Sequence, residues 1–263
     1  MSTPSLAEYV SGYETMFAHY DALCRRLTAD QLATRSLCPE WDVRGVIAHV
    51  MGVEQMLDGW SPSAESPPPF AEVAAFAREV AGLSPDELAD RVAAVTASRL
   101  DHLRSLEASV VDAPSFTPTG IATYGAFLQI RLFDLWVHAR DIAVPMGDEL
   151  DDTGFVAETA LTEVAGAAGY IVGKKIGLPD GKSVVFHVSG GVERDVAVRV
   201  DGRAAVVDAV DDPDVEVLAD VGTFVLLAAG RLDPQEQIDS GRIAWRGDQT
   251  WGDRAARNLA YTM

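Results

Sequence analysis

Three ionisable side chains, Asp134, His138 and Asp141, occur at spacings of four and three residues inside a long apolar segment. These spacings place all three on one face of a helix. The segment, from about residue 121 to 144, otherwise carries apolar side chains on every side, which predicts a buried helix. An unpaired carboxylate in such a place is strongly unfavourable, so it must be neutralised by an arginine, another cation or a metal ion.

A second histidine, His49, extends this set. It lies at the edge of the apolar face of another predicted helix, near Val46 and Val53, and an edge position points into the space between two helices. Two histidines and one carboxylate from facing helices can bind a divalent ion and leave coordination positions open, as catalytic metal sites do. His49, Asp134 and His138 are therefore the candidate metal ligands.

Other interpretations of the same residues stay open. Arg131 precedes Asp134 by three residues and can pair with it, and His49 can be a hydrogen-bonded core histidine. Asp141 can orient His138 as a hydrogen-bond acceptor, replace Asp134 as a ligand, or pair with a neighbouring arginine. The sequence therefore predicts a cluster of charges, and only its partners decide whether it binds a metal ion.

The elements that would position these residues are helices over the first 150 residues or so. Asp42 stands where the N-cap of a helix is expected, and Ser84 with Glu87 three residues later predicts a capping box. A proline-rich segment, Ser61 to Pro69, cannot be helical. Apolar residues recurring every three and four positions predict helices over residues 9–27, 42–57, 70–80, 84–106 and 121–144. The four long ones suggest a four-helix bundle.

From Gly181 the apolar residues alternate instead, which is typical of strands. Strands are expected over residues 183–188, 195–200, 204–207, 215–218 and 243–245, and helices over 223–229 and 251–259. The first three strands predict an antiparallel meander, with helices on one face of the sheet. The expected fold class is α+β: a four-helix bundle over residues 1–150 and a small α+β domain over residues 151–263.

Composition restricts the partners. The chain of 263 residues has 40 acidic and 21 basic side chains, a net charge of −19, so its field repels nucleic acids and anionic membranes. Its two cysteines, Cys24 and Cys38, suggest neither a disulfide scaffold nor a thiolate zinc site. Residues 1–4 lack the basic start of an export signal, and the apolar segment 157–173 contains Glu158 and Glu163. A cytoplasmic protein is expected.

Three segments resemble one known family. CPEWDVRGVIAHV over residues 38–50 is similar to a signature of the mycothiol-dependent maleylpyruvate isomerase family, and RLFDLWVHARDI over 131–142 resembles its fourth-helix metal motif. GRLDP over 230–234 and WRGD over 245–248 resemble its C-terminal domain. The resemblance implies a DinB-like N-terminal four-helix bundle followed by a sterol-carrier-like C-terminal domain.

The same resemblance implies a zinc-type site at His49, Asp134 and His138, with the thiol mycothiol as cosubstrate. The implied activity is a metal- and mycothiol-dependent isomerase or thiol S-transferase acting on a small electrophile such as maleylpyruvate. The founding isomerase has Glu at the position of Asp134, which is one methylene shorter. A water-bridged carboxylate or Asp141 is therefore the alternative third ligand.

Two other functions compete with this one. The first is a metal-dependent hydrolase that activates water, and the second is a non-enzymatic protein that binds a small apolar ligand. Arg231 and Arg254 are the candidate substrate-binding residues for an anionic substrate, and no further catalytic residue is assigned. Trp41 and Trp136 are expected to pack at the bundle interface. The remaining histidines, at positions 19, 102 and 187, have no acidic neighbours at ligand spacing, so no role is assigned to them.

Overall fold

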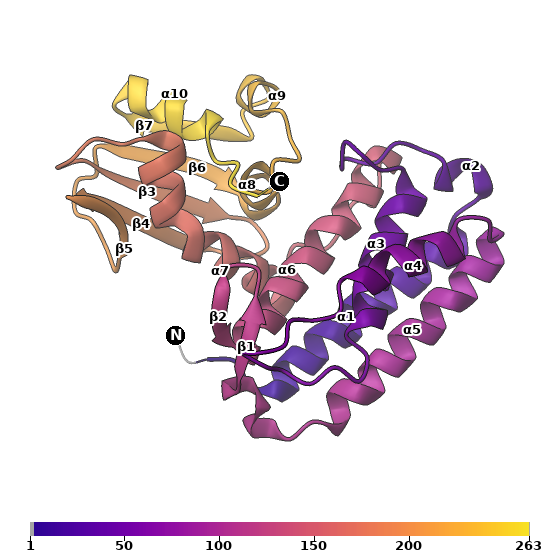
Figure 1. Cartoon of the computed structure of the whole chain (residues 1–263). Helices are drawn as coiled ribbons and strands as arrows, with labels where there is room; N and C mark the ends of the chain where they lie inside the picture. The colour runs from indigo at the N-terminus through magenta and orange to yellow at the C-terminus, as the bar shows by residue number, and fades with distance from the viewer. Residues whose placement is uncertain (1–2, 263) are drawn as a thin grey trace. The chain divides into compact units, whose positions relative to one another are not determined.

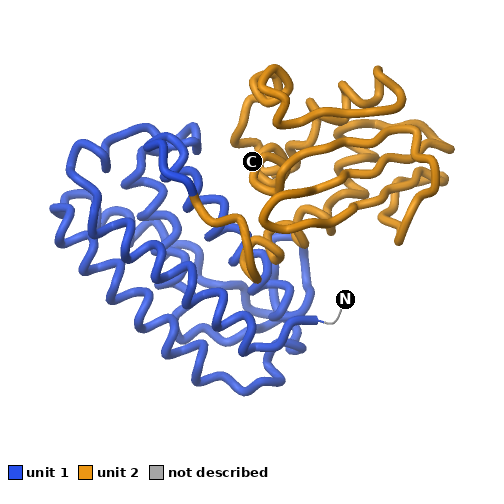
Figure 2. The backbone as a smooth tube through the Cα atoms, turned by 180° about the vertical axis from the view of Figure 1, so that it is seen from behind, with its two compact units in different colours: residues 1–149 blue, residues 150–263 orange. Residues whose placement is uncertain are grey.

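The computed structural model describes residues 3–262, which form two compact units, Met1–Glu149 and Leu150–Met263 (Figure 2). Each unit has its own buried core. Residues 1, 2 and 263 lie outside the described residues, so the first half of the N-terminal segment considered for an export signal has no structural account.

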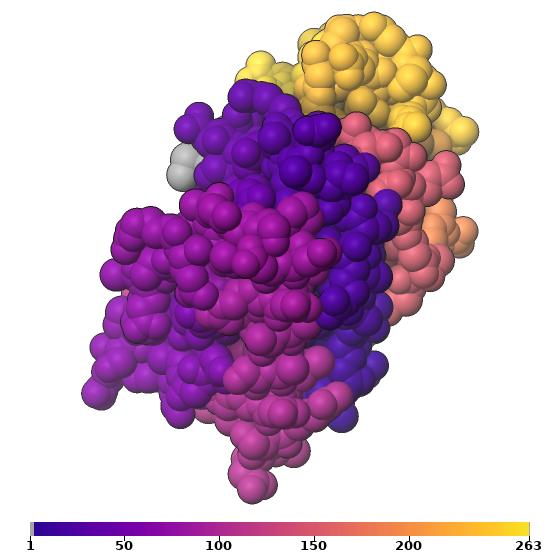
Figure 3. Space-filling model, turned by 90° about the vertical axis from the view of Figure 1, so that its right-hand side faces the viewer, coloured from indigo at the N-terminus to yellow at the C-terminus, as the bar shows by residue number. Residues whose placement is uncertain are grey.

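The N-terminal unit is built on four long helices, α1 (Leu6–Arg26), α3 (Val43–Met56), α5 (Pro85–Ser105) and α6 (Tyr124–Ala143) (Figure 1). Helix α1 packs against α5 and α6, and α3 packs against the same two helices, which makes a four-helix bundle. Helix α4 (Ala71–Val80) lies outside the bundle against α3. In Figure 3 the indigo, purple and magenta parts of the chain lie side by side over one face of this unit. The remaining elements are short: α2 (Ala29–Leu32), η1 (Ala108–Asp112), the hairpin β1 (Pro114–Thr117) and β2 (Gly120–Thr123), and η2 (Val144–Met146).

Local side-chain chemistry fixes where these helices begin. The Asp42 carboxylate accepts a hydrogen bond from the backbone N–H of Gly45, and Ser84 with Glu87 forms a complete capping box, so both predicted caps are confirmed. Helix α6 begins three residues later than predicted. Residues 120–123 pair as strand β2 instead, and the Thr123 hydroxyl then caps the helix at Ala126.

Helix α6 is buried on nearly every side, as its sequence predicts. Its buried residues include large apolar side chains such as Leu128 and Trp136, and they also include the charged residues Arg131, Arg140 and Asp141. Buried charges need partners from neighbouring helices. The centre of the bundle is therefore where the chemistry of the unit is concentrated.

The C-terminal unit is a five-stranded sheet with helices on one face. The strand order is β5 (Arg203–Val207), β4 (Arg194–Asp201), β3 (Ser183–Ser189), β6 (Val215–Asp220), β7 (Ile243–Gly247). Helices α7 (Gly154–Tyr170), α8 (Val221–Ala228) and α10 (Gln249–Arg257) all contact residues of one face, and α9 (Pro234–Asp239) adjoins α10. The predicted antiparallel meander of β3, β4 and β5 is confirmed, and β6 joins the sheet by pairing with β3 in parallel.

One helical stretch, α7 together with the π-helical η3 (Ile171–Ile176), has the length and apolar composition of a membrane span. Half of its most apolar window is buried in the folded chain. Core helices of folded domains share these properties, and Glu158 on this stretch forms an ion pair with Arg194 of the same unit. The stretch is therefore accounted for as a core helix of the C-terminal unit.

Candidate metal centre

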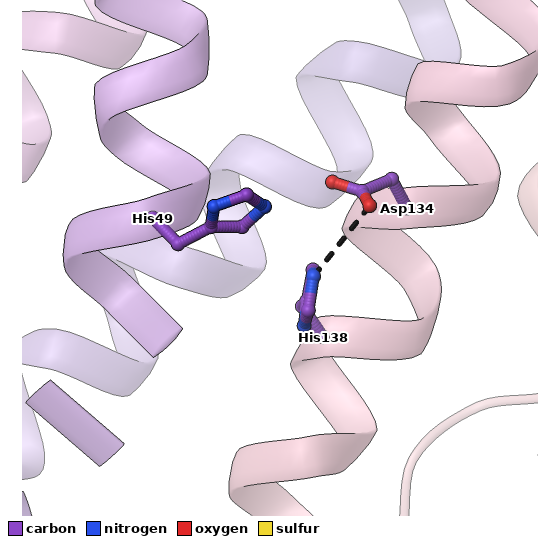
Figure 4. Close-up of side chains that lie close together, drawn as sticks. All are labelled: His49, Asp134 and His138. Carbon is purple, nitrogen blue, oxygen red and sulfur yellow. Dashed lines mark ion pairs between the residues drawn. The ribbon is translucent and has the colours of Figure 1, made fainter. Parts of the chain in front are cut away.

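The structure brings His49, Asp134 and His138 together between two facing helices of the bundle (Figure 4). His49 comes from α3, whereas Asp134 and His138 come from successive turns of α6. One nitrogen or oxygen atom of each side chain lies within 4.8 Å of the others. His138 Nε2 is 3.5 Å from Asp134 Oδ1, and the two imidazole ring centres are 5.1 Å apart. The side chains therefore converge on one point.

This donor set fits a divalent transition metal such as zinc. Zinc prefers imidazole nitrogen and carboxylate oxygen, and catalytic sites commonly supply three protein ligands and leave a fourth position for water or substrate. Bonds of about 2.0–2.1 Å at a tetrahedral ion separate ligand atoms by roughly 3.4 Å, so side-chain shifts of about 1 Å would close the set. The Asp134 side chain is 27% exposed, which leaves the cluster accessible to solvent.

Asp141 contacts the ring nitrogen of His138 that lies opposite the one near Asp134. Its carboxylate lies 2.8 Å from His138 Nδ1 and is fully buried. The carboxylate accepts a hydrogen bond from the Nδ1–H of the ring, so the opposite nitrogen, Nε2, is the one that faces Asp134 and His49. The contact matches the interpretation of Asp141 as an acceptor that orients His138.

Asp134 has a second partner in Arg131. Arg131 Nη1 donates to Asp134 Oδ2 at 2.6 Å, while the other carboxylate oxygen, Oδ1, faces His138. The sequence leaves two alternative roles for Asp134, an ion pair with Arg131 or a place among the metal ligands. In the structure the two oxygens of the carboxylate point in different directions, so the ion pair with Arg131 leaves Oδ1 facing His138.

A buried ion network behind this pair was missed by sequence reasoning. Arg131 also donates to Glu54 of α3, at 3.1 Å from Nε and 2.7 Å from Nη2. Arg99 of α5 lies 3.3 Å from the other Glu54 oxygen, and Glu54 and Arg99 are both fully buried. The available signal was Glu54 itself, which lies one helical turn after the apolar Val50 and so on the buried face.

The charges in this cluster shift the pKa values of its members in opposite directions. Burial alone would raise the pKa of Asp134, but Arg131 first, and then His138 and His49, lower it well below its usual range. Burial alone would lower the pKa of His138, but Asp134 and Asp141 raise it to about 9. Without a metal ion, His138 is therefore protonated at neutral pH and Asp134 is ionised.

The two tryptophans near the cluster behave differently. The Trp41 ring centre lies 4.6 Å from that of His49 and 6.0 Å from that of His138, and the residue is half-buried. Trp41 thus lies at the interface of α3 and α6, as predicted, and it also borders both histidines of the candidate site. Trp136 is buried as predicted, with the Arg140 guanidinium 3.2 Å from its ring centre.

A pocket of about 520 Å³ adjoins the cluster. It lies between the start of α3 and helix α4, and both Trp41 and His49 belong to its wall. The other lining residues are Asp42, Arg44, Gly45, Ala48, Phe70, Val73, Ala74, Ala77 and Ala81. A molecule in this pocket would therefore lie beside one of the candidate metal ligands.

The candidate substrate arginines lie in the C-terminal unit. Arg254 donates to the backbone carbonyl of Ile176 and lies against the ring of Trp251, and Arg231 donates to the carbonyl of Ala229 at 2.9 Å. Both side chains thus have structural partners, and their roles toward a substrate stay predictions.

The expectation of no acidic neighbours is wrong for His102, whose Nδ1 lies 3.8 Å from Asp58, and for His187. The Nδ1 atom of His187 lies 2.7 Å from Asp195 and its Nε2 lies 3.2 Å from Glu216. These residues belong to the strands on either side of His187, so spacing along the sequence could not reveal them. The two carboxylates contact opposite ring nitrogens, so they do not converge with His187 on one point.

The sequence profile of the mycothiol maleylpyruvate isomerase N-terminal domain matches residues 14–143. This range contains every residue of the cluster and of the adjoining pocket. Two uncharacterized proteins from strains of Mycobacterium tuberculosis are 26% identical to the chain over 132 residues, which are 50% of this chain and 64% of theirs. The chain thus spans less than two thirds of the length of these relatives.

Crystal structures of a mycothiol-dependent maleylpyruvate isomerase and of its histidine-to-alanine mutant share the fold. They superpose with TM-scores of 0.59 and 0.60 at 18% identity, and the match covers 93% of this chain and 95% of theirs. The predicted α+β architecture, a helical bundle followed by a small α+β domain, is therefore confirmed.

Proposed function

Because the chain belongs to the family that carries the mycothiol maleylpyruvate isomerase N-terminal domain, we propose that it is an enzyme that uses a divalent metal ion, zinc being the best fit, and mycothiol to act on a small electrophilic substrate. The observation that carries the proposal is the convergence of His49, Asp134 and His138 within the region that matches the family. A bound metal ion would supply electrostatic stabilisation of a thiolate and so lower the pKa of the thiol.

The residues of the chain have distinct tasks in this proposal. His49, Asp134 and His138 hold the ion, and Asp141 keeps the Nε2 atom of His138 turned toward it. Arg131 fixes the orientation of Asp134 by holding its second oxygen. With three protein ligands, positions remain for the sulfur of a thiol.

The reaction begins when the thiol loses its proton to solvent or a base, and the resulting thiolate attacks an electrophilic carbon. In an isomerase the sulfur adds to an activated double bond, rotation occurs about the new single bond, and the C–S bond then breaks to return the thiolate. In an S-transferase the C–S bond persists, and the leaving group departs with the electron pair of the bond that it loses. The two outcomes differ only in which bond breaks after the attack.

The test uses the full chain loaded with zinc. Mycothiol is supplied with maleylpyruvate or with an aryl halide, and isomerised product, thiol consumption and released halide are measured. We expect turnover that requires both thiol and metal. Turnover that needs metal but no thiol would indicate a hydrolase and overturn the proposal, and binding without turnover would indicate a non-enzymatic carrier. Variants Arg231→Ala and Arg254→Ala test substrate binding, with an increase in KM expected if either residue contacts an anionic substrate.

A further inference from the structure

The pocket beside His49 has an unusually apolar wall for a site expected to take small charged molecules. Helix α4 contributes Val73, Ala74 and Ala77, Ala81 follows its last residue, and Phe70, just before the helix, is 56% exposed. Ala48 and Trp41 form the opposite side. Exposed aromatic rings and contiguous apolar side chains around a concave surface are typical of a ligand site.

Its two charged lining residues are already engaged with the backbone. Arg44 Nη1 donates to the carbonyl of Val80 at 2.9 Å, near the end of α4. The Asp42 carboxylate accepts from the N–H of Gly45 at 2.7 Å as the cap of α3. These contacts hold the helix ends that frame the pocket, and the two charges are of opposite sign. Arg44 and Asp42 together therefore give no net electrostatic attraction to a substrate with two negative charges.

Helix α4 is held close to α3 by a glycine. A side chain at Gly52 would approach the backbone carbonyl of Val73 to 3.2 Å, so α4 lies against the backbone of α3 at this point. The pocket is thus framed by helix backbone, capped helix ends and small side chains. The pocket is therefore formed by the folded chain itself.

We infer that this pocket binds the apolar part, an uncharged aryl or alkyl group, of the electrophilic substrate. The inference rests on the proposed function, because the bound molecule is a substrate only if the protein is an enzyme. It follows from the shared position of His49, which belongs both to the pocket wall and to the metal-ligand cluster, so an apolar group in the pocket places an attached electrophilic carbon beside the cluster. The preferred substrate class is therefore apolar electrophiles, and small dicarboxylates fit the pocket poorly.

A binding measurement tests this inference independently of catalysis. The probe is N-phenyl-1-naphthylamine, an uncharged fluorophore that brightens in apolar surroundings, titrated into the full zinc-loaded chain. We expect saturable binding of one probe per chain. An uncharged aryl halide should displace the probe, whereas maleate at the same concentration should not.

Two pocket variants and one matched control locate the binding. Ala74→Phe and Ala77→Phe place a ring inside the pocket, and we expect each to weaken probe binding about tenfold or more because the ring occupies the apolar volume. Ala75→Phe makes the same change on the same helix at an exposed residue outside the lining, and it should leave binding unchanged. Zinc content and circular dichroism verify that all three variants are folded.

The outcomes separate this inference from the proposed function. Unchanged probe binding in both pocket variants, or displacement by maleate as effective as by the aryl halide, overturns the apolar pocket whether or not the protein consumes thiol. Specific probe binding that is lost in the pocket variants supports the pocket even if no thiol is consumed, a result that would count against the proposed function alone.

Discussion

Asp134 belongs both to the candidate metal site and to the network of ion pairs in the bundle. One of its oxygens accepts from Arg131 and the other faces His138. Arg131 is itself shared with Glu54, which is also held by Arg99. Removing Asp134 therefore leaves Arg131 with a carboxylate, and removing Arg131 leaves Glu54 with a guanidinium. The two residues can be tested separately.

The first prediction compares Asp134→Asn with Arg131→Met. Asp134→Asn should strongly weaken zinc binding, because an amide oxygen is a poorer ligand than a carboxylate. Arg131→Met should leave zinc bound, since it removes no ligand, but it should lower the free energy of unfolding by about 1.5–3 kcal/mol, because Glu54 and Asp134 each lose a charge-assisted hydrogen bond while Glu54 keeps Arg99. Zinc titrations and denaturant midpoints on both variants provide the measurement. Intact zinc affinity in Asp134→Asn would instead favour Asp141 or a bridging water as the third ligand.

The second prediction concerns the two histidines. His49→Ala and His138→Ala should each remove most of the bound metal from a chain that otherwise holds about one ion, because each leaves only two protein ligands. His187→Ala is the matched control, since His187 lies in the other unit and its ring contacts Asp195 and Glu216. Elemental analysis of untagged protein measures the effect. Full metal content in both cluster variants would refute the assignment.

The third prediction follows from the pKa of His138, which is raised to about 9 in the folded metal-free chain. Its unfolded value is about 6.5, so the protonated histidine stabilises the fold fully below pH 6.5 or so, and this contribution is lost as the pH rises through about 9. The unfolding free energy of metal-free protein should therefore fall by a few kcal/mol between these pH values.

Denaturant unfolding at several pH values measures this slope, with His138→Gln as the comparison. The variant cannot gain or lose the proton, so its slope over the same interval should be shallower. Zinc should oppose the decline in the native chain, because a metal-bound imidazole is deprotonated. Equal slopes in the two proteins would show that another group carries the pH dependence.

At the scale of elements, the long helices of the N-terminal unit and the antiparallel pairing of β3, β4 and β5 were predictable, whereas helix α7 and the parallel pairing of β6 with β3 were not. The helical period and the caps at Asp42 and Ser84 locate α1, α3, α4, α5 and α6 to within a few residues. The short elements α2, α9 and the hairpin β1–β2 carry too few residues for a period to be recognised. The parallel pairing of β6 with β3 depends on where the chain returns to the sheet, which alternation of apolar residues does not encode.

The candidate site was predictable only in part, because some of its contacts depend on how the helices pack against one another. Asp134, His138 and Asp141 share one helix, so their spacing alone places them together. His49 was selected by its edge position, but its distance to the others depends on how α3 packs against α6. The Glu54–Arg99 contact joins two helices through fully buried charges, and no spacing within one helix reports such a pair. The pocket depends on α4 lying against α3, which is also a tertiary feature.

The fourth prediction tests that contact between α3 and α4. Gly52→Leu adds a side chain where even a Cβ atom would meet the Val73 carbonyl at 3.2 Å, so α4 must shift. We expect a loss of about 1–3 kcal/mol in unfolding free energy and weaker binding of the apolar probe. Metal binding should persist, because the cluster lies between α3 and α6. Gly82→Leu is the control, since a Cβ atom at Gly82 meets nothing within 4 Å. Equal effects of the two substitutions would show that the close contact at Gly52 does not hold the pocket in shape.

At the scale of the whole molecule, the described chemistry is concentrated in one unit. The metal-ligand cluster, the buried ion network and the apolar pocket all consist of residues within Met1–Glu149. The net charge of −19 disfavours an anionic substrate at long range, which agrees with the apolar pocket beside His49. The domain assignment from sequence, 1–150 and 151–263, stays a prediction about independent folding.

The fifth prediction concerns that independence. A fragment of residues 1–149 should fold as a helical bundle, because its helices bury their apolar faces against one another and its buried charges pair within the fragment. It should also bind one zinc ion and the apolar probe with affinities close to those of the full chain, since it contains all of the residues that form both sites. Circular dichroism, zinc titration and probe fluorescence on the fragment and the full chain provide the comparison. A spectrum dominated by strand or disorder would refute the division. A folded fragment that binds zinc but shows no thiol-dependent turnover would assign the C-terminal unit, with Arg231 and Arg254, to the reaction itself.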